Sequence, residues 1–206
     1  MKVLLINGSP RQNGCTFTAL SEVAKALNKS DIQTETIHVG NADIRGCTAC
    51  GNCKKTGKCV FDDMVNEVAA TLPQYDGIVV GSPVYYASPN GGMLSFLDRM
   101  FYSSPAVDKR MMVGASVVSA RRAGCSSSLD VLNKYFSLAG MPIAGSNYWN
   151  MVHGSKPEDV LKDEEGLQIM RVLGEHMAFL IKSIALGKAQ FGLPQKENRI
   201  MTNFIR

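Results

Sequence analysis

Short apolar segments and amphipathic segments alternate along this chain of 206 residues, and this alternation constrains the fold more than any other feature. Five apolar or β-branched segments are predicted as strands, at 2–7, 33–39, 76–86, 110–120 and 141–149. Apolar residues recur at helical spacing over 16–28, 62–74, 91–102, 126–139 and a long stretch that ends at Gly187. Strands that alternate with helices form a parallel sheet covered on both faces. We therefore expect an α/β fold with a doubly wound, five-stranded parallel sheet in three layers.

The length suits one domain, and no linker, repeat or low-complexity segment divides the chain. We assign residues 1–187 to this domain, with a cysteine-rich loop at 46–59, and residues 188–206 to a C-terminal arm. Hydrophobic residues make up 45% of the chain and charged residues 19%, a balance that allows a core without disulfides. The cysteines are therefore available for chemistry.

No apolar run approaches the roughly 18–20 residues that a membrane span needs, and the first apolar segment is too short for a signal peptide. We expect a cytoplasmic protein without a membrane partner. In that reducing compartment, clustered cysteines are more often metal-binding or catalytic than cross-linked. The net charge of +4 is spread along the chain, which argues against nucleic acid and suits a small anionic ligand.

The loop after the first predicted strand, NGSPRQNGCT, occupies residues 7–16. Sheets of this kind bind ligands at the carboxyl ends of the strands, where the strand order reverses. Hydrogen-bonding side chains, a positive charge and a tight turn at a helix start all favour an anion here, and the candidates are Ser9, Arg11, Asn13, Gly14 and Thr16. Because the loop contains neither G-x-G-x-x-G nor G-x-x-x-x-G-K-[ST], we predict a terminal monophosphate.

Two further loops leave the ends of predicted strands. The loop at 81–92, GSPVYYASPNGG, carries Tyr85 and Tyr86, which can flank a flat ring. The loop at 119–128, SARRAGCSSS, carries Arg121 and Arg122, whose charge suits a reduced ring or the phosphate of an incoming nucleotide. Both loops are expected at the same edge of the sheet as the first one.

Four of the six cysteines fall within thirteen positions, in the loop after the second predicted strand. They have the spacing C-x₂-C-x₂-C-x₅-C and are Cys47, Cys50, Cys53 and Cys59. Three thiolates two residues apart are arranged as in ferredoxin-type clusters, and nearby lysines would offset the negative charge. Zinc prefers two separated pairs and is less favoured. A redox-active thiol pair and a loop without metal remain open alternatives.

The segments GSPRQNGCT, GSPVYYASPNGGM and ARRAG resemble the three FMN-contacting loops of the flavodoxin-like NAD(P)H-dependent FMN reductase superfamily. The resemblance covers roughly residues 1–185 and implies a flavodoxin-like fold, FMN as cofactor and NAD(P)H as co-substrate. It implies a phosphate loop that contains Ser9, Arg11, Cys15 and Thr16. It implies contacts to the isoalloxazine ring from Pro83, Val84, Tyr85, Tyr86, Ser88, Ser119, Arg121, Arg122 and Gly124.

The family often has asparagine where this chain has Cys15. We interpret Cys15 as a small residue at a helix start whose N–H can bind phosphate, and not as a catalytic residue. The spacing of the clustered cysteines is similar to that of the iron–sulfur flavoproteins, a branch of this superfamily. That similarity implies one [4Fe–4S] cluster on Cys47, Cys50, Cys53 and Cys59.

Two functions are expected from these features, and neither needs a catalytic side chain. The first is an FMN-dependent NAD(P)H oxidoreductase that reduces a quinone, a flavin or another small acceptor. The alternative is an iron–sulfur flavoprotein that carries electrons through FMN and a [4Fe–4S] cluster to a ferredoxin-like protein. A regulatory module that reports redox state through its thiols is a third possibility. The resemblance further implies a homodimer or homotetramer.

Overall fold

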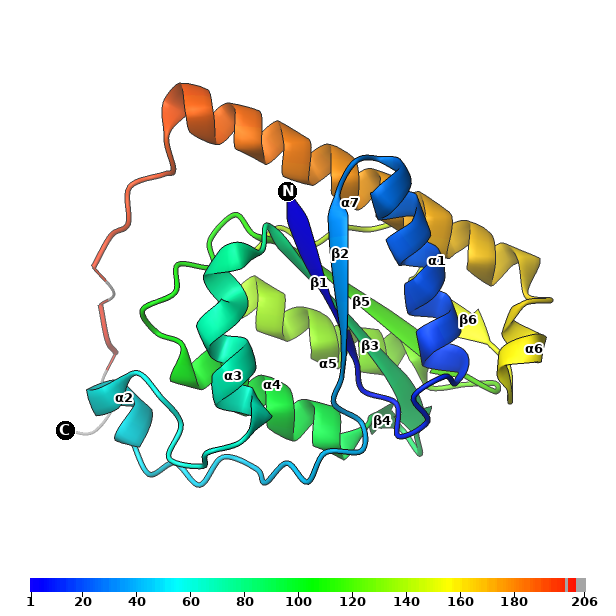
Figure 1. The fold of residues 1–206 in the computed structure, drawn as a ribbon, viewed down its shortest axis with the longest axis horizontal. Coiled ribbons are helices and arrows are strands. Elements are labelled where there is room, and N and C mark those ends of the chain that lie inside the picture. Colours follow the sequence, from blue (N-terminus) through cyan, green and yellow to red (C-terminus); the bar gives the residue numbers. More distant parts are fainter. Residues whose placement is uncertain (199, 203–206) are drawn as a thin grey trace.

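The computed structural model, which describes residues 1–198 and 200–202, contains five parallel strands in the order β2-β1-β3-β5-β6 (Figure 1). These strands are β1 (Lys2–Asn7), β2 (Gln33–His38), β3 (Gly77–Tyr85), β5 (Val113–Ala120) and β6 (Met151–His153). A two-residue strand, β4 (Ser88–Pro89), pairs antiparallel with the end of β3. The order is that of flavodoxin, and it reverses between β1 and β3. The predicted α/β class and the doubly wound parallel sheet are confirmed.

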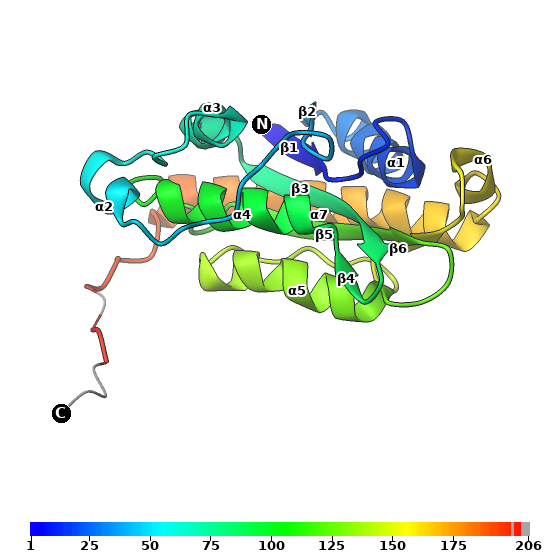
Figure 2. The same cartoon turned by 90° about the horizontal axis from the view of Figure 1, so that it is seen from below.

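Helices cover both faces of the sheet and make the predicted three layers. One face carries α1 (Cys15–Lys29) and α7 (Glu164–Phe191). The other carries α3 (Met64–Thr71), α4 (Gly91–Ser103) and α5 (Cys125–Leu138). Two short helices lie outside the layers, namely α2 (Asn52–Thr56) in the cysteine-rich loop and α6 (Pro157–Val160) before α7. Figure 2 shows α1 and α5 on opposite sides of the sheet.

β1 illustrates why the central strands are continuous apolar runs. Val3 and Leu5 pack in the core under α1 and α7, whereas Leu4 and Ile6 pack in the core under α3, α4 and α5. All four side chains are at most 1% exposed. Alternate side chains of a strand point to opposite faces, so a strand buried on both faces needs an apolar residue at every position.

The fifth strand of the sheet lies later in the chain than predicted. In the segment predicted as a strand, only Ile143 pairs with β5, through an isolated bridge to Gly114. The regular strand is β6, which pairs with Val118–Ala120. Between the two, Ser146 Oγ donates to the carbonyl oxygen of Tyr148 at 2.6 Å. Such local side-chain hydrogen bonds compete with the sheet ladder and turn the chain outward.

The prediction that Gly187 ends the last helix is wrong. α7 continues to Phe191 and ends at Gly192, which has a φ of 73°. A glycine inside a helix costs about 1 kcal/mol relative to alanine, and tertiary packing routinely outweighs that cost. The segment without regular structure therefore begins at Gly192 rather than at residue 188. In Figure 2 its first described part, residues 192–198, leads away from the sheet.

The start of α3 lies within the predicted helical segment 62–74. Asp63 is the N-cap, and its carboxylate accepts the N–H of Val65 at 3.1 Å.

None of the helices in the described ranges combines the length and the apolar character that a membrane span requires.

Candidate functional site

An open cleft of about 270 Å³ lies at the carboxyl ends of β1, β3, β5 and β6. The loops that follow these strands supply its lining, which consists of Ser9, Arg11, Cys15, Thr16, Pro83, Val84, Tyr85, Ser119, Ala120, Arg121, Gly154 and Ser155. The cleft contains the point at which the strand order reverses, where sheets of this topology bind their ligands. All three loops predicted from the sequence therefore meet at one site.

The loop after β1 is held in place by hydrogen bonds around Ser9. Asn7 Oδ1 accepts the N–H of Ser9 at 3.1 Å, and Ser9 Oγ accepts the N–H of Arg11 at 3.2 Å. His38 Nε2 lies 2.6 Å from the carbonyl oxygen of Ser9. Because a carbonyl oxygen can only accept, Nε2 is the nitrogen that carries the proton. These bonds connect the loop to β1 and to the end of β2.

The start of α1 forms the end of the cleft that suits an anion. Gly14 is the N-cap and makes no side-chain hydrogen bond, and the first turn contains no acidic residue. The N–H groups of a first helical turn have no intrahelical partner, and the helix dipole adds a partial positive charge there. Arg11 contributes a full positive charge to the same cleft. Cys15 and Thr16 of this turn both line it.

A pair of buried hydroxyls joins the first loop to the end of β5. Thr16 Oγ1 and Ser119 Oγ lie 2.8 Å apart, and both residues line the cleft. The pair has two hydroxyl hydrogens but uses only one for this bond. Among the described residues neither hydroxyl has another partner. One donor therefore remains for a ligand oxygen, which fits a phosphate group at this end of the cleft.

An exposed aromatic hairpin forms another wall. β3 passes the edge of the sheet and turns back into β4 at Tyr86 and Ala87. Tyr85 is half exposed and lines the cleft, whereas Tyr86 is fully exposed and has a φ of 55°. A side chain other than glycine pays a conformational cost in that left-handed region, and such strain is concentrated at functional sites.

Gly124, in the loop after β5, lies close to Val84 of this hairpin. Its φ is 89°, and a Cβ added there would lie 2.8 Å from Val84 Cγ1. Ser127, one turn into α5, donates from Oγ to the carbonyl oxygen of Ala87 at 3.2 Å. The loop after β5 thus packs directly against the hairpin, and a side chain at position 124 would displace it.

The structure does not bring every predicted site residue to the cleft. Nine of the predicted residues line it: Ser9, Arg11, Cys15, Thr16, Pro83, Val84, Tyr85, Ser119 and Arg121. The predicted residues that do not line it are Asn13, Gly14, Tyr86, Ser88, Arg122 and Gly124. Gly14 and Gly124 instead shape the backbone, as the caps of α1 and α5.

Gly154 and Ser155 also line the cleft, and sequence reasoning did not identify them. They follow β6, so the rule that selected the other loops would have found them if the fifth strand had been placed correctly. The thiol of Cys15 donates to the carbonyl oxygen of Gly154 at 3.6 Å. Burial raises the pKa of the Cys15 thiol. A protonated thiol is a poor nucleophile, which agrees with a structural role for Cys15.

The four clustered cysteines line one small pocket at the far end of α4. Cys53 is buried, Cys59 is partly buried, and Cys47 and Cys50 are exposed. α2, which carries Cys53, lies between two glycines in the left-handed conformation, Gly51 and Gly57. Within residues 1–198 and 200–202, however, no three His, Cys, Asp or Glu side chains are placed to hold one metal ion.

The side chains of this pocket have the chemistry of thiolate ligands. Its lining combines the thiols with mostly apolar surface. Ser103 Oγ lines it as well and is a buried hydroxyl without a hydrogen-bond partner in the described part of the chain. A [4Fe–4S] cluster takes four thiolates, one at each iron, so its ligands surround it and do not meet at one point.

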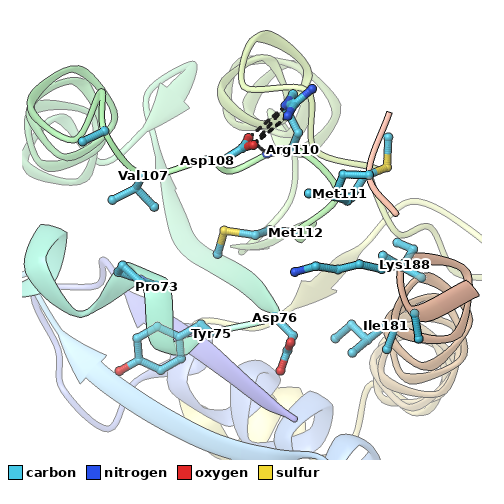
Figure 3. A pocket seen from close by; sticks show the side chains of 15 residues that line it. Pro73, Tyr75, Asp76, Val107, Asp108, Arg110, Met111, Met112, Ile181 and Lys188 are labelled. Atoms are coloured by element: carbon cyan, nitrogen blue, oxygen red, sulfur yellow. Dashed lines mark hydrogen bonds and ion pairs between the residues drawn. The ribbon is translucent and has the colours of Figure 1, made fainter. Parts of the chain in front are cut away.

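A larger cavity, of about 900 Å³, lies at the opposite edge of the sheet (Figure 3). Asp76 and Met112, which directly precede β3 and β5, line it together with Lys188 of α7. Asp108 and Arg110 form an ion pair at its rim, with 2.7 Å between Oδ2 and Nη2. Because it lies at the amino ends of the strands, the topology does not favour it as the cofactor site.

Comparisons with known proteins identify the family of this chain and the likeness of its fold. A sequence model of the NADPH-dependent FMN reductase family matches residues 1–156. An iron–sulfur flavoprotein of Methanocaldococcus jannaschii is 31% identical over 191 residues, which cover 89% of this chain and 99% of that protein.

Two solved structures illustrate the likeness in fold. RosB, solved with bound 8-demethyl-8-formylriboflavin-5′-phosphate, has a TM-score of 0.70 at 12% identity, with 99% of this chain and 92% of RosB covered. The NAD(P)H:quinone oxidoreductase from Methanothermobacter marburgensis has a TM-score of 0.65 at 14% identity, with 85% and 94% covered. At such identities the two likenesses show the fold alone. The chain belongs to the NADPH-dependent FMN reductase family, a family of flavin-dependent oxidoreductases.

Proposed function

We propose that this chain binds FMN in the cleft and uses it to pass reducing equivalents from NAD(P)H to a quinone, a flavin or another small acceptor. The cleft itself carries the proposal, because it joins an anion-binding helix start to an exposed aromatic hairpin at the switch point of the sheet. Membership in the FMN reductase family supports FMN as the cofactor.

In this proposal the phosphate of FMN binds at the start of α1, to Ser9, Arg11 and the free hydroxyl hydrogen of the Thr16–Ser119 pair. The flavin ring binds toward Tyr85 and Arg121. When bound, FMN supplies the redox chemistry, because it can take up two electrons from a reduced nicotinamide and release them singly or in pairs. The chain supplies binding, orientation and charge. Arg121, which is exposed and lines the cleft, can stabilise negative charge on the ring.

Flavin binding and turnover test this function directly. We expect the purified chain to bind about one FMN, more tightly than riboflavin, because a charged phosphate adds charge-assisted hydrogen bonds. We also expect it to oxidise NADH or NADPH when a soluble quinone is present. Failure to bind FMN overturns the proposal. Binding without NAD(P)H oxidation overturns the reductase assignment and leaves the electron carrier described next.

The cysteine pocket favours a second candidate function, an iron–sulfur flavoprotein that passes single electrons between a ferredoxin-like protein and FMN. All four thiols line one pocket, and the Methanocaldococcus jannaschii relative is named an iron–sulfur flavoprotein. α4 connects the two sites, since Asn90 caps it beside the hairpin and Arg99 lines the cysteine pocket. Nine residues of helix span about 14 Å, so both sites belong to one rigid unit.

Anaerobic purification with metal analysis separates the two candidates. A cluster predicts about four iron and four sulfide per chain. Cys59→Ser should then lower the iron content, while Cys125→Ser, at a buried cysteine in the core under α5, should retain it. Iron-free protein that still binds FMN rejects the electron carrier and retains the reductase.

We also propose that the chain works as a homodimer or homotetramer in which a second copy covers the hairpin. Tyr86 supports this, because it is fully exposed beside the cleft and aromatic residues are enriched where protein surfaces meet. Light scattering after gel filtration measures the mass. A monomer that retains full activity rejects the proposal.

A further inference from the structure

Arg99 on α4 is an arginine buried to 1% exposure, and every one of its donors is used. Its Nε donates to Cys59 Sγ at 3.2 Å. Its Nη1 donates to Asp63 Oδ2 at 2.6 Å and to the carbonyl oxygen of Arg45 at 3.2 Å. Its Nη2 donates to Asp63 Oδ1 at 2.9 Å and to the carbonyl oxygen of Phe61 at 3.2 Å. A guanidinium has five N–H groups, so this set is complete.

The acceptors of Arg99 come from both ends of the cysteine-rich loop. Arg45 lies two residues before Cys47, whereas Cys59, Phe61 and Asp63 lie at the other end. The ring of Phe61 covers the guanidinium, with 5.1 Å between its centroid and Arg99 Cζ. One side chain therefore ties both ends of the loop to α4. A lysine could not do this, because an ammonium group has three donors and no planar fork.

The contact with Cys59 connects Arg99 to the pocket that the four thiols line. A buried arginine with a bidentate carboxylate partner is already neutralised, so the bond to sulfur is not needed to balance charge. It instead orients Cys59 Sγ, which lines the same pocket as Cys47, Cys50 and Cys53. Arg99 and the unpartnered Ser103 hydroxyl lie on the helix side of that pocket.

We propose that Arg99 is a positioning residue for the cysteine pocket: it holds Cys59 and the two ends of the loop in the arrangement that receives an iron–sulfur cluster, and it raises the reduction potential of the bound cluster. The effect on the cluster rests on the second candidate function. The positioning of the loop does not rest on that function, because the five hydrogen bonds are made by protein groups alone.

The direction of the effect on the potential follows from electrostatics. A hydrogen bond donated to a ligating sulfur stabilises the reduced cluster, which is the more negative form. Removal of the bond makes the potential more negative. The negative charge of Asp63 lowers the reduction potential of the cluster, whereas the positive charge of Arg99 raises it. Loss of the Asp63 charge should therefore shift the potential in the positive direction. Asparagine at position 63 keeps an oxygen for the N–H of Val65, so Asp63→Asn retains the cap of α3.

Four variants test the proposal. Arg99→Lys keeps the charge but loses the planar fork. Arg99→Met with Asp63→Asn removes both charges, so the partly buried carboxylate is not left unpaired. Asp63→Asn alone leaves Arg99 bonded to Cys59. Arg171→Gln is the matched control, because Arg171 pairs with Glu22 at 3.1 Å between α7 and α1, away from the pocket.

Iron content and potential are measured on anaerobically purified protein. We expect Arg99→Lys and the double variant to lose at least half of the bound iron, or to hold it at a more negative potential than wild type. Asp63→Asn should shift the potential in the positive direction, and Arg171→Gln should match wild type. Wild-type iron content and potential in both Arg99 variants overturn the proposal.

A wild-type protein without iron rejects the cluster candidate, and the positioning of the loop is then decided on metal-free protein. Amide hydrogen exchange across residues 45–63 should become at least tenfold faster in Arg99→Lys and in the double variant, and stay unchanged in Arg171→Gln. Unchanged exchange in the Arg99 variants overturns the positioning role. Far-UV circular dichroism confirms that the compared variants are folded.

Discussion

Thr16 Oγ1 and Ser119 Oγ, 103 positions apart in the sequence, lie 2.8 Å from each other beneath the cleft. The two residues are 1% and 3% exposed. Their hydrogen bond connects the first turn of α1, where an anion is favoured, to the carboxyl end of β5, where the arginine loop begins. This hydrogen bond therefore joins the phosphate end of the proposed flavin site directly to its ring end.

Thr16→Val tests the ligand-facing donor of this pair. Valine has nearly the same shape but no hydroxyl, so we expect FMN to bind about tenfold more weakly, or about 1.4 kcal/mol for one hydrogen bond to an anion. Quenching of flavin fluorescence measures the affinity. The control is Thr71→Val on α3, whose hydroxyl donates to the carbonyl oxygen of Val68. Unchanged FMN affinity in Thr16→Val would exclude the Thr16 hydroxyl as a phosphate ligand.

Arg121 and Arg122 are expected to differ although they are neighbours and both exposed. Only Arg121 lines the cleft. Arg121→Gln should weaken flavin binding by roughly five- to tenfold, about 1 kcal/mol for a solvent-screened charge, and should make binding less sensitive to salt. Arg122→Gln should leave both quantities near wild type. Equal effects from the two substitutions would contradict the arrangement of this loop.

Gly40 is expected to be essential to the shape of the phosphate loop. A Cβ at position 40 would lie 2.0 Å from the carbonyl oxygen of Ser9, and a backbone atom cannot rotate away. Gly40→Ala should destabilise the fold by about 2–4 kcal/mol and abolish tight FMN binding. Gly145→Ala is the control, because a Cβ there meets nothing within 4 Å. Chemical denaturation and FMN titration measure the two effects, and a wild-type result for Gly40→Ala would contradict this packing.

Cys15 is expected to be unreactive although it lies in the cleft. Burial raises the pKa of its thiol, so the thiolate is scarce at neutral pH. In metal-free protein, iodoacetamide at pH 7 should modify the exposed Cys47 and Cys50 before Cys15. Cys15→Ala should keep at least half of the wild-type turnover. Complete loss of turnover, with FMN still bound, would assign Cys15 a catalytic role.

The pairing of Asp108 with Arg110 predicts a pH-dependent contribution to stability. Arg110 lowers the pKa of Asp108 from 3.8 to about 2, so the carboxylate stabilises the folded state above about pH 4 and stops doing so as the pH falls toward about 2. The side chain of Asp108 is 40% exposed, which limits the contribution to roughly 0.5 kcal/mol. Urea unfolding of Asp108→Asn should show that deficit at pH 7 and little of it near pH 2. A deficit of equal size at both pH values would contradict this assignment.

Periodic patterns predicted the class of fold because they are local. β1 is apolar at every position since both faces are buried, and α1 carries its apolar residues at helical spacing, so each element is recognisable without its neighbours. The fifth strand was misplaced because its short ladder depends on contacts with β5, while the polar turn at Ser146 interrupts an otherwise plausible strand. Gly187 was misread because a single glycine costs a helix only about 1 kcal/mol, which is too little to end it.

The amino-acid sequence by itself determined the parallel sheet, three of the loops that reach its carboxyl edge and the grouping of four cysteines in one loop, because the alternation of strands and helices, the turn residues and the cysteine spacing can each be recognised in short segments. Only the tertiary structure decided which members of those loops face the cleft. Arg121 and Tyr85 line it, whereas Arg122 and Tyr86 do not. Only the fold, too, placed Arg99 against Cys59, forty positions away, because a hydrogen bond from a buried side chain depends on packing between elements that no local pattern records.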